Sequence, residues 1–432
     1  MLRLVVSPTY GVLPAVAVLF LAAAAACSST NIVTTNEGGA GPAQPDGGAD
    51  AEPPPPSYFV TVLPETTTRV GTDDVGAAFL ASSLDDTGRL GILFADQKPP
   101  ARDRYHVRYV TREGDASAVS ATFDGGQVLG DVTMAFHPSG EMTICSIEES
   151  GTNDIRIVRL DKNGRVTRDF RLGNLMPAAQ YRGAGICQIL PDDEDALVMT
   201  GVISNSGPLT VRLDRVPREG APTLLTAANP CLERSATSER LGSMWSWARS
   251  KAGTIWTNGG CELDPKTGKT ITDKAIPSGS VLTVDTTARG DTYLIQGDTR
   301  TSPTVAVALP SLTETSLLLE DPFTDTQMDL RSRFLFTDQG WTMVEGELRT
   351  ANIAFWHSPS LGGPASRLEF AGPFTTIGSQ LGSNGDYWLV GGLYKTASFG
   401  VTPLTHHGSA DATNHLVARF RDWPSIVAAH GQ

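Results

Sequence analysis

Short apolar runs alternate with polar, glycine-rich turns from about residue 58 onward, and no long segment shows the 3.6-residue period of an amphipathic helix. A turn followed by an apolar, β-type run occurs seven times, with a mean spacing of about 50 residues. Six of the runs follow a glycine turn, and the third follows Asp192-Asp193-Glu194. The seven runs are 89–95, 141–147, 196–203, 254–258, 292–296, 341–344 and 387–390, and the turn glycines are Gly88, Gly140, Gly253, Gly290, Gly340 and Gly385.

Further strand-like segments flank each run. In the first unit, 75–81 precedes the run, and 105–110 and 119–123 follow it. The repeat is therefore predicted to be four antiparallel strands joined by hairpins. One such sheet cannot cover its own faces, whereas seven sheets stacked radially cover one another. We predict an all-β fold, a seven-bladed β-propeller of four-stranded antiparallel blades, with a pair of β-sandwiches as the alternative.

The two ends of the predicted domain supply a way to close the ring. The segment 58–63 is strand-like and precedes the first unit, whereas the last unit has a clear third strand at 415–420 and then Trp423-Pro424. Proline makes a poor interior strand because it cannot donate a ladder hydrogen bond. The segment 58–63 could therefore pair into the last blade and remove an open edge.

The N-terminus carries an export signal. An apolar run over 12–26 follows Arg3 and is too short and alanine-rich for a comfortable spanning helix. It ends in Ala24-Ala25-Ala26-Cys27, which resembles the lipobox of bacterial lipoproteins, although that family usually has leucine where Ala24 stands. The resemblance implies a signal peptide over 1–26 and lipidation of Cys27. An ordinary signal peptide, with Cys27 incidental, is the alternative.

Residues 28–57 have almost nothing apolar to bury and end in four consecutive prolines, so we predict that 27–57 is a lipidated cysteine with a disordered tether. The β-propeller domain is then 58–432. Ser28 follows the cysteine, and in lipoproteins of this kind a residue other than aspartate favours the outer membrane. The expected location is extracytoplasmic, on the outer membrane of a Gram-negative bacterium.

The formal charge of −13 argues against nucleic acid as a partner. The sequence after the signal contains no second apolar run of about 18 residues, so the lipid is the expected membrane contact. We expect a monomer.

The last unit resembles a known bacterial repeat. The segment 391–400 leads through Pro403-Leu404 and Gly408 to Leu416-Val417-Ala418-Arg419-Phe420. This is similar to the seven-bladed β-propeller repeats called SBBP, in which a glycine, a serine-rich turn and a phenylalanine precede a strand ending Val-Ala-Lys-Leu. The resemblance covers about 30 residues and departs at Asn414-His415, where the family prefers an aromatic residue. It implies the fold and says little about activity.

Four cysteines remain besides Cys27, an even number that suggests two disulfides in an exported chain. We favour Cys145–Cys187 and Cys231–Cys261 among the three pairings. Cys145 falls on the second strand of one blade and Cys187 on the first strand of the next. Buried free thiols are the alternative. The sequence contains no Cys-x-x-Cys pair that could form half of a zinc site, so we expect no bound metal. We also expect no cofactor.

Candidate binding residues are few. Trp245 and Trp247 alternate on one strand and could form a sugar-stacking platform, although such residues more often pack between blades. Arg331 and Arg333 share a face of a predicted innermost strand and could hold an anion, unless they line a solvated channel. The three histidines His406, His407 and His415 are close in sequence, but neighbouring strand residues point apart.

The sequence has no Gly-x-Ser-x-Gly, phosphate loop or His-Glu-x-x-His, so no catalytic residue is assigned. We therefore expect a non-catalytic binding or scaffolding propeller for a protein or glycan partner at the cell envelope. The alternative is a propeller enzyme, a lyase or hydrolase that acts on polysaccharide. Two or more carboxylates or histidines that converge at the mouth of the channel from different blades, with perturbed pKa values, would favour the enzyme, whereas a smooth polar or aromatic rim would favour binding.

Overall fold

A computed structural model gives the structure of the chain, and its described residues all lie within one compact unit, Ile32–Gln432. The predicted signal peptide and tether lie outside the described residues. The structure describes 58–70, 73–98, 101–117, 121–124, 127–128, 132–149, 154–174, 185–202, 210–227, 229–236, 247–274, 281–287, 289–296, 305–317, 333–336, 340–346, 352–372, 374–381, 385–400, 402–421 and 423.

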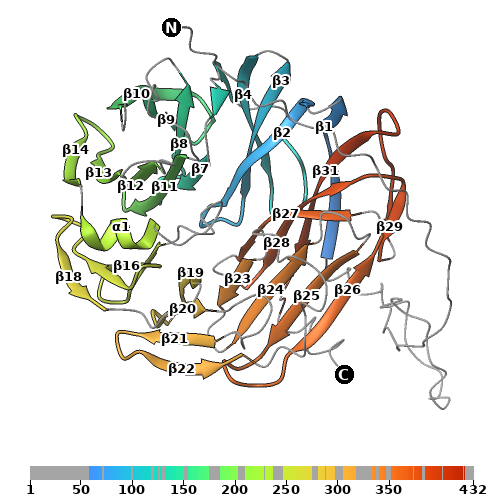
Figure 1. Ribbon diagram of the computed structural model, residues 1–432. Coiled ribbons are helices and arrows are strands. Elements are labelled where there is room, and N and C mark those ends of the chain that lie inside the picture. Colours follow the sequence, from blue (N-terminus) through green and yellow to red (C-terminus); the bar gives the residue numbers. More distant parts are fainter. Residues whose placement is uncertain are drawn as a thin grey trace, which may run out of the picture. The chain divides into compact units, whose positions relative to one another are not determined.

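Antiparallel sheets of four strands, the blades, follow one another along the chain (Figure 1). The first blade is β2 (Asp73–Leu84), β3 (Leu90–Lys98), β4 (Ala101–Val110) and β5 (Ala121–Asp124). The second is β7 (Thr133–Phe136), β8 (Met142–Glu149), β9 (Asp154–Leu160) and β10 (Val166–Asn174), with β6 (Gln127–Val128) also paired to β8. The third is β11 (Gly185–Asp192), β12 (Asp195–Val202), β13 (Thr210–Val216) and β14 (Thr223–Ala227).

Three further blades have the same consecutive order. The fourth is β15 (Trp247–Arg249), β16 (Ile255–Thr257), β17 (Cys261–Leu263) and β18 (Thr270–Asp273). The fifth is β19 (Val281–Thr286), β20 (Thr292–Gln296), β21 (Val305–Leu309) and β22 (Thr313–Ser316). The sixth is β23 (Arg333–Phe336), β24 (Trp341–Gly346), β25 (Asn352–Ser358) and β26 (Ser366–Ala371).

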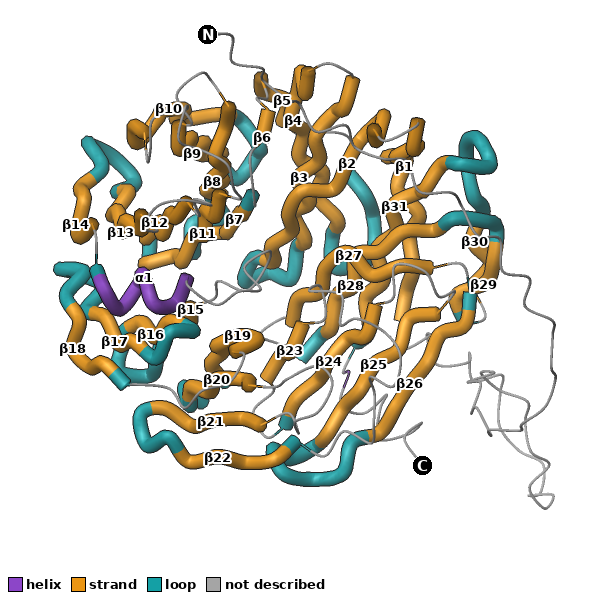
Figure 2. The backbone as a smooth tube through the Cα atoms, in the orientation of Figure 1, coloured by secondary structure: helices purple, strands orange, loops and turns teal. Residues whose placement is uncertain are grey.

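The closing blade takes strands from both ends of the described chain. Its order is β27 (Phe374–Leu381), β28 (Tyr387–Leu393), β31 (Ala412–Phe420) and β1 (Tyr58–Val70). A two-stranded hairpin, β29 (Ala397–Phe399) and β30 (Thr402–Leu404), lies between β28 and β31 in the sequence. Figure 2 shows β1 beside β31. The predicted pairing of the N-terminal strand into the last blade is therefore confirmed.

β1 also pairs with β2, so the closing and first blades form one eight-stranded sheet. Counted as two blades, this sheet brings the described strands to seven blades, and counted as one it brings them to six. The fold class, an all-β propeller, is confirmed, and the number seven remains a prediction.

The apolar core lies between blades. Each cluster of buried side chains draws on the facing sides of two successive blades, and one such cluster spans each successive pair. Between the closing and first blades, Trp388 and Val417 pack with Ile92 and Phe94. Radial stacking thus covers apolar faces that an isolated sheet would expose.

The turns that enter the second strands have the expected chemistry. Gly88 adopts a φ of 80°, which glycine takes at no steric cost, and the Asp85 carboxylate accepts hydrogen bonds from the backbone N–H groups of Thr87 and Arg89 at 2.9 Å each. At Gly340 the reason is space, because a Cβ there would overlap the carbonyl oxygen of Ser358.

The fourth blade is completed by β18, as the predicted four-stranded layout requires. The helix α1 (Pro230–Ala236), which lies in the sequence between the third and fourth blades, was not anticipated. Asn229 caps α1, since its side-chain oxygen accepts the Cys231 backbone N–H at 2.9 Å. Among the described residues, no helix has both the length and the apolar character needed to cross a membrane.

The fourth strand of the fifth blade differs from the position that its apolar pattern predicts. That pattern predicts a strand at 316–319, whereas β22 spans Thr313–Ser316. A short turn at Pro310–Leu312 pairs Ala308 directly with Thr313, so the strand starts earlier and Leu317 enters the core instead.

Candidate functional site at the closure of the ring

Charged and histidine side chains gather where the closing strand meets the first blade. We call Glu65, Asp96, His106, Arg108 and His415 the closure cluster; they come from β1, β3, β4 and β31. Glu65 lies within an irregularity of the β1–β31 pairing, between Val62 and Thr66.

Glu65 and Arg108 form a buried ion pair at the centre of this cluster. Arg108 donates to Glu65 Oε1 from Nε at 2.7 Å and from Nη2 at 2.6 Å, and the two residues are 6% and 8% exposed. Burial by itself would raise the pKa of Glu65. Hydrogen bonds from His106 and Arg108, together with the Arg108 charge, outweigh burial and hold the pKa below its ordinary value. Glu65 is therefore a carboxylate at neutral pH.

His106 connects this pair to the surface. Its Nε2 lies 3.5 Å from Glu65 Oε1, and its Nδ1 lies 3.2 Å from Asp96 Oδ1. The ring stacks on Phe94 with centroids 5.3 Å apart. The Asp96 side chain is 41% exposed, whereas that of His106 is 8% exposed. The cluster thus meets solvent at Asp96.

His415 attaches the closing blade to the first blade. Its Nε2 lies 2.8 Å from the carbonyl oxygen of Ala77 and 3.1 Å from Thr67 Oγ1, while Thr67 donates to the same carbonyl at 2.9 Å. A carbonyl oxygen only accepts, so Nε2 carries the proton and Nδ1 is an acceptor in the neutral ring. Nδ1 is buried without a hydrogen-bond partner. Burial lowers the pKa of His415, which keeps the ring neutral.

This arrangement holds strands together. A general base needs a ring nitrogen or carboxylate oxygen directed at a reacting group. In the closure cluster, both ring nitrogens of His106 face carboxylates, Arg108 occupies Glu65 Oε1, and Glu65 Oε2 is buried without a hydrogen-bond partner. The cluster is suited to holding the closing strand electrostatically against the first blade.

A second network has the same character. Arg159, 1% exposed, lies between the second and third blades, where Nε is 3.3 Å from Glu141 Oε2. Arg218 also contacts Glu141, at 2.5 Å, and Glu194 accepts the Ser139 backbone N–H at 3.0 Å. These charges again join neighbouring blades.

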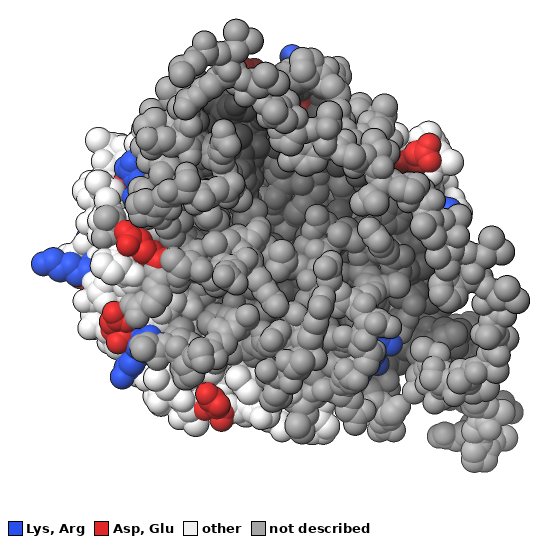
Figure 3. All heavy atoms as spheres, viewed as in Figure 1, with Lys and Arg blue, Asp and Glu red and all other residues white. Residues whose placement is uncertain are grey.

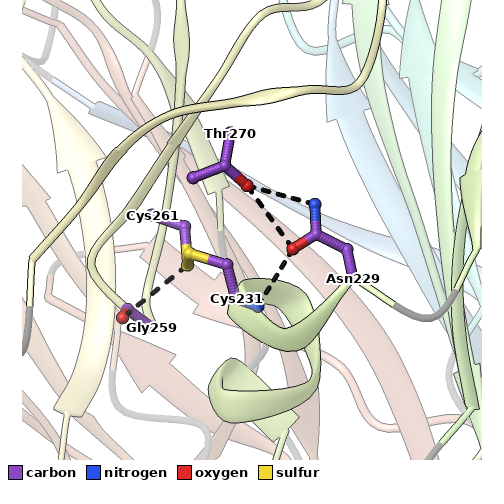
Figure 4. The surroundings of a disulfide bond; sticks show 5 residues. All are labelled: Asn229, Cys231, Gly259, Cys261 and Thr270. Carbon is purple, nitrogen blue, oxygen red and sulfur yellow. Dashed lines mark hydrogen bonds between the residues drawn. A yellow bond between two sulfur atoms is a disulfide. The ribbon is translucent and has the colours of Figure 1, made fainter.

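Both expected disulfides are present. Cys145–Cys187 joins β8 to β11, with Cα atoms 5.9 Å apart, and Cys231–Cys261 joins α1 to β17, with Cα atoms 5.8 Å apart. The first connects consecutive blades, as predicted. The second ties α1 to the fourth blade (Figure 4).

The predicted binding residues are only partly described. Trp247 begins β15, is 9% exposed and packs with Leu197 and Cys231 in the cluster between the third and fourth blades. This position agrees with packing between blades, the alternative to a sugar-stacking platform. Trp245 and Arg331 lie outside the described residues. Arg333 begins β23, the first strand of its blade, but its side chain also lies outside them.

The three neighbouring histidines have separate surroundings. His406 Nε2 lies 2.7 Å from the Ala412 carbonyl oxygen, the His407 backbone N–H donates to Asn414 Oδ1 at 2.7 Å, and His415 faces the first blade.

Sequence reasoning missed the closure cluster. His106 and Arg108 alternate with buried Tyr105, Val107 and Tyr109 on β4, so two charged residues on one face of a buried strand were the available signal. Their partners lie in distant segments, and no local spacing reveals them.

One group of described side chains has the geometry to hold a metal ion. Single ligand atoms of Cys231, Cys261 and Asp273 lie within 4.8 Å of one another. The two sulfur atoms are joined as a disulfide, so they could act as metal ligands only after reduction.

The described surface carries charges of both signs. In the view of Figure 3, Lys and Arg alternate with Asp and Glu along the left-hand rim. The visible described surface therefore presents no large patch of a single sign.

Comparison with known proteins adds little beyond the fold. No protein-family model and no curated protein matches the chain. Among solved structures, puromycin hydrolase is similar at 13% identity and a TM-score of 0.46 over 74% of this chain, which spans 51% of that enzyme. Aleuria aurantia lectin in complex with alpha-methyl-L-fucoside is similar at 9% identity and a TM-score of 0.40, over 70% of this chain and 96% of the lectin. A subtype N11 neuraminidase-like protein of A/flat-faced bat/Peru/033/2010 (H18N11) is similar at 10% identity and a TM-score of 0.37, over 80% of this chain and 88% of that protein.

Proposed function

We propose that this protein is a lipid-anchored β-propeller of the bacterial cell envelope that binds a protein or glycan partner without catalysing a reaction. The supporting observation is the pair of disulfides, Cys145–Cys187 and Cys231–Cys261. Structural disulfides persist in oxidising compartments and are rare in the cytosol. Their presence fits a chain that is exported by the N-terminal signal.

Export and anchoring are proposed from the sequence around Cys27. The thiol is the acceptor for lipid, cleavage precedes it, and the segment up to residue 57 serves as the tether. One acyl chain binds a membrane only marginally, whereas two chains anchor stably. Ser28, where aspartate would favour the inner membrane, supports an outer-membrane location. The likeness of the last unit to SBBP repeats belongs to the same proposal.

The binding role is supported by how the described acid–base groups are used. In the closure cluster and around Arg159, carboxylates, histidines and arginines pair with one another across strands. Such groups stabilise the ring and leave the loops at the ends of the blades for recognition, as in other loop-built sites on rigid scaffolds.

Anchoring is tested by metabolic labelling with an alkyne fatty acid and cell fractionation, for the wild type and Cys27→Ser. Wild-type protein should take the label and stay with the membrane. Cys27→Ser should take no label and either remain uncleaved or be released as soluble protein with both disulfides intact. Wild-type protein that takes no label and washes off the membrane would refute the anchor.

Binding is tested separately, with Cys27→Ser protein on a glycan array and in a pull-down from envelope extract. A saturable partner, with no turnover of envelope polysaccharides, supports the proposal. Release of reducing or unsaturated sugar ends from a polysaccharide would instead establish a hydrolase or lyase.

A further inference from the structure

Cys231, Cys261 and Asp273 meet at one edge of the fourth blade, with single ligand atoms within 4.8 Å of one another. Cys261 lies directly opposite Asp273 in the β17–β18 ladder. The cysteines are 3% and 0% exposed, whereas Asp273 is exposed. The set therefore combines two buried sulfur atoms with a carboxylate that opens toward solvent.

Contacts other than the sulfur–sulfur bond also hold the backbone around this set. Asn229 caps α1 through the Cys231 backbone N–H, and its Nδ2 donates to Thr270 Oγ1 at 3.2 Å, which ties α1 to β18 (Figure 4). Leu232, the next residue of α1, is fully buried in the core between the third and fourth blades. Opening the disulfide thus leaves Cys231 near Cys261 and Asp273.

We propose that the reduced form of this disulfide is a binding site for a thiophilic divalent cation such as zinc, with Cys231 and Cys261 as thiolate ligands and Asp273 as the carboxylate ligand. Zinc takes thiolate and carboxylate ligands in tetrahedral geometry, and three protein ligands leave a fourth position for water. The exposed carboxylate gives the ion a route from solvent. The ion would then hold α1 on the fourth blade in place of the disulfide.

The reaction balances with a dithiol reductant. Thiol–disulfide exchange transfers two electrons and two protons from the dithiol, giving two cysteine thiols and a disulfide in the reductant. Each thiol then releases one proton as it becomes a thiolate ligand, so the binding of one Zn²⁺ expels two protons to water. Oxidation and metal binding therefore compete for the same two sulfur atoms.

The test uses the full chain carrying Cys27→Ser, which removes the fifth thiol, with Co²⁺ as a spectroscopic probe. After reduction by a phosphine, the protein should bind one Co²⁺ with thiolate-to-cobalt charge-transfer absorption, and Zn²⁺ should displace it. The oxidised protein should give no such band. The site is independent of the proposed anchoring and partner binding, so failure of either leaves this outcome unchanged.

The second disulfide supplies a matched control. Among the described residues, Cys145 and Cys187 have no metal-ligating carboxylate or histidine grouped with them, so Cys145→Ser/Cys187→Ser should keep the band. Cys231→Ser/Cys261→Ser should abolish it. Asp273→Asn, which retains both thiols, should weaken Co²⁺ binding about ten-fold or more, since loss of even an outer-shell group costs that much.

Two results would overturn the proposal: a reduced protein that keeps its β-sheet circular dichroism but gives no charge-transfer band, or a band that persists without Cys231 and Cys261. Equal Co²⁺ affinity of Asp273→Asn and its parent would remove Asp273 from the site and overturn the three-ligand set.

Discussion

Tyr58 lies directly opposite Phe420 on the neighbouring strand, and its hydroxyl donates to the Phe399 carbonyl oxygen at 3.1 Å. Two segments more than 300 residues apart therefore form one ladder, and the last blade is completed by the strand that precedes the first. The Tyr58 ring packs edge-on against Phe370 of the sixth blade, with centroids 6.2 Å apart. The closing strand thus links three blades.

The first prediction concerns Glu65, whose ion pair with Arg108 fastens this strand. Glu65→Gln leaves the buried Arg108 charge without its counter-ion, and we expect a loss of about 3–5 kcal/mol in the free energy of unfolding at pH 7. The measurement is urea unfolding. The exposed substitution Glu113→Gln should change stability by less than about 0.5 kcal/mol.

The same pair sets a pH dependence. Because the folded-state pKa of Glu65 lies below its ordinary value of 4.5, its stabilisation is complete above that pH and is lost as the pH falls through the lowered pKa. The difference between wild type and Glu65→Gln should therefore shrink in acid. A difference that stays constant from pH 7 to pH 3 would contradict an ionised Glu65.

The second prediction concerns Asp285 at the end of β19, whose pKa is raised rather than lowered, so stability should depend on pH in the opposite direction. Burial raises its pKa to about 6, even though its carboxylate accepts the backbone N–H groups of Phe336 at 3.2 Å and Thr286 at 2.7 Å. A raised carboxyl pKa gives stability that is complete below the ordinary value of 3.8 and is lost as the pH rises through 6.

Asp285→Asn removes this titration. Between pH 4 and pH 7, the stability of the wild type should fall relative to that of the variant by about 3 kcal/mol, measured by denaturant unfolding at each pH. The exposed control Asp411→Asn should follow the wild-type profile. Parallel profiles for wild type and Asp285→Asn would show that Asp285 titrates normally.

The third prediction concerns the disulfides. They close loops of 42 and 30 residues, and chain entropy assigns each about 3–4 kcal/mol. Cys145→Ser/Cys187→Ser and Cys231→Ser/Cys261→Ser should each lower the melting temperature. The two losses should be nearly additive, because the bridges lie in different core clusters. Non-reducing peptide mapping checks the pairing, and four alkylatable thiols in exported protein would disprove it.

The fourth prediction separates packing from sugar binding at Trp247. Because the ring is buried between the third and fourth blades, Trp247→Ala should cost about 3–5 kcal/mol of stability. Thermal unfolding measures this cost. Wild-type stability combined with lost glycan binding would show instead that Trp247 is a recognition residue.

The order of strands could be predicted because hairpins are local. Gly88 and Asp85 fix one turn within five residues, and the buried strand Tyr387–Leu393 follows Gly385 as its apolar run indicates. Shorter elements were harder. β18 exposes Thr270 and Ile271, so it lacks an apolar pattern, and α1 has only seven residues.

Some of the candidate sites could likewise be predicted from the sequence, and others could not. The Cys145–Cys187 pair could be inferred once both cysteines were placed on strands, because stacked blades bring them together. The closure cluster could not, because Glu65, Arg108 and His415 have no local relation that marks them as neighbours. Trp247 had two readings in the sequence, and its burial favours packing.

The sequence by itself determined most of the segments that become strands, because alternating polarity and turn residues act over a few positions. It also indicated that the first strand should close the ring, because the last unit lacks a suitable fourth strand. Only the tertiary structure decided which polar groups are removed from solvent and which of them are brought into contact. Glu65 is 6% exposed and ionised because β4 places Arg108 against it. Asp285 has a raised pKa because its partly buried carboxylate loses solvation, with no cation among the groups that set that pKa. Such energies depend on solvation and on contacts between distant strands, which a linear pattern does not encode.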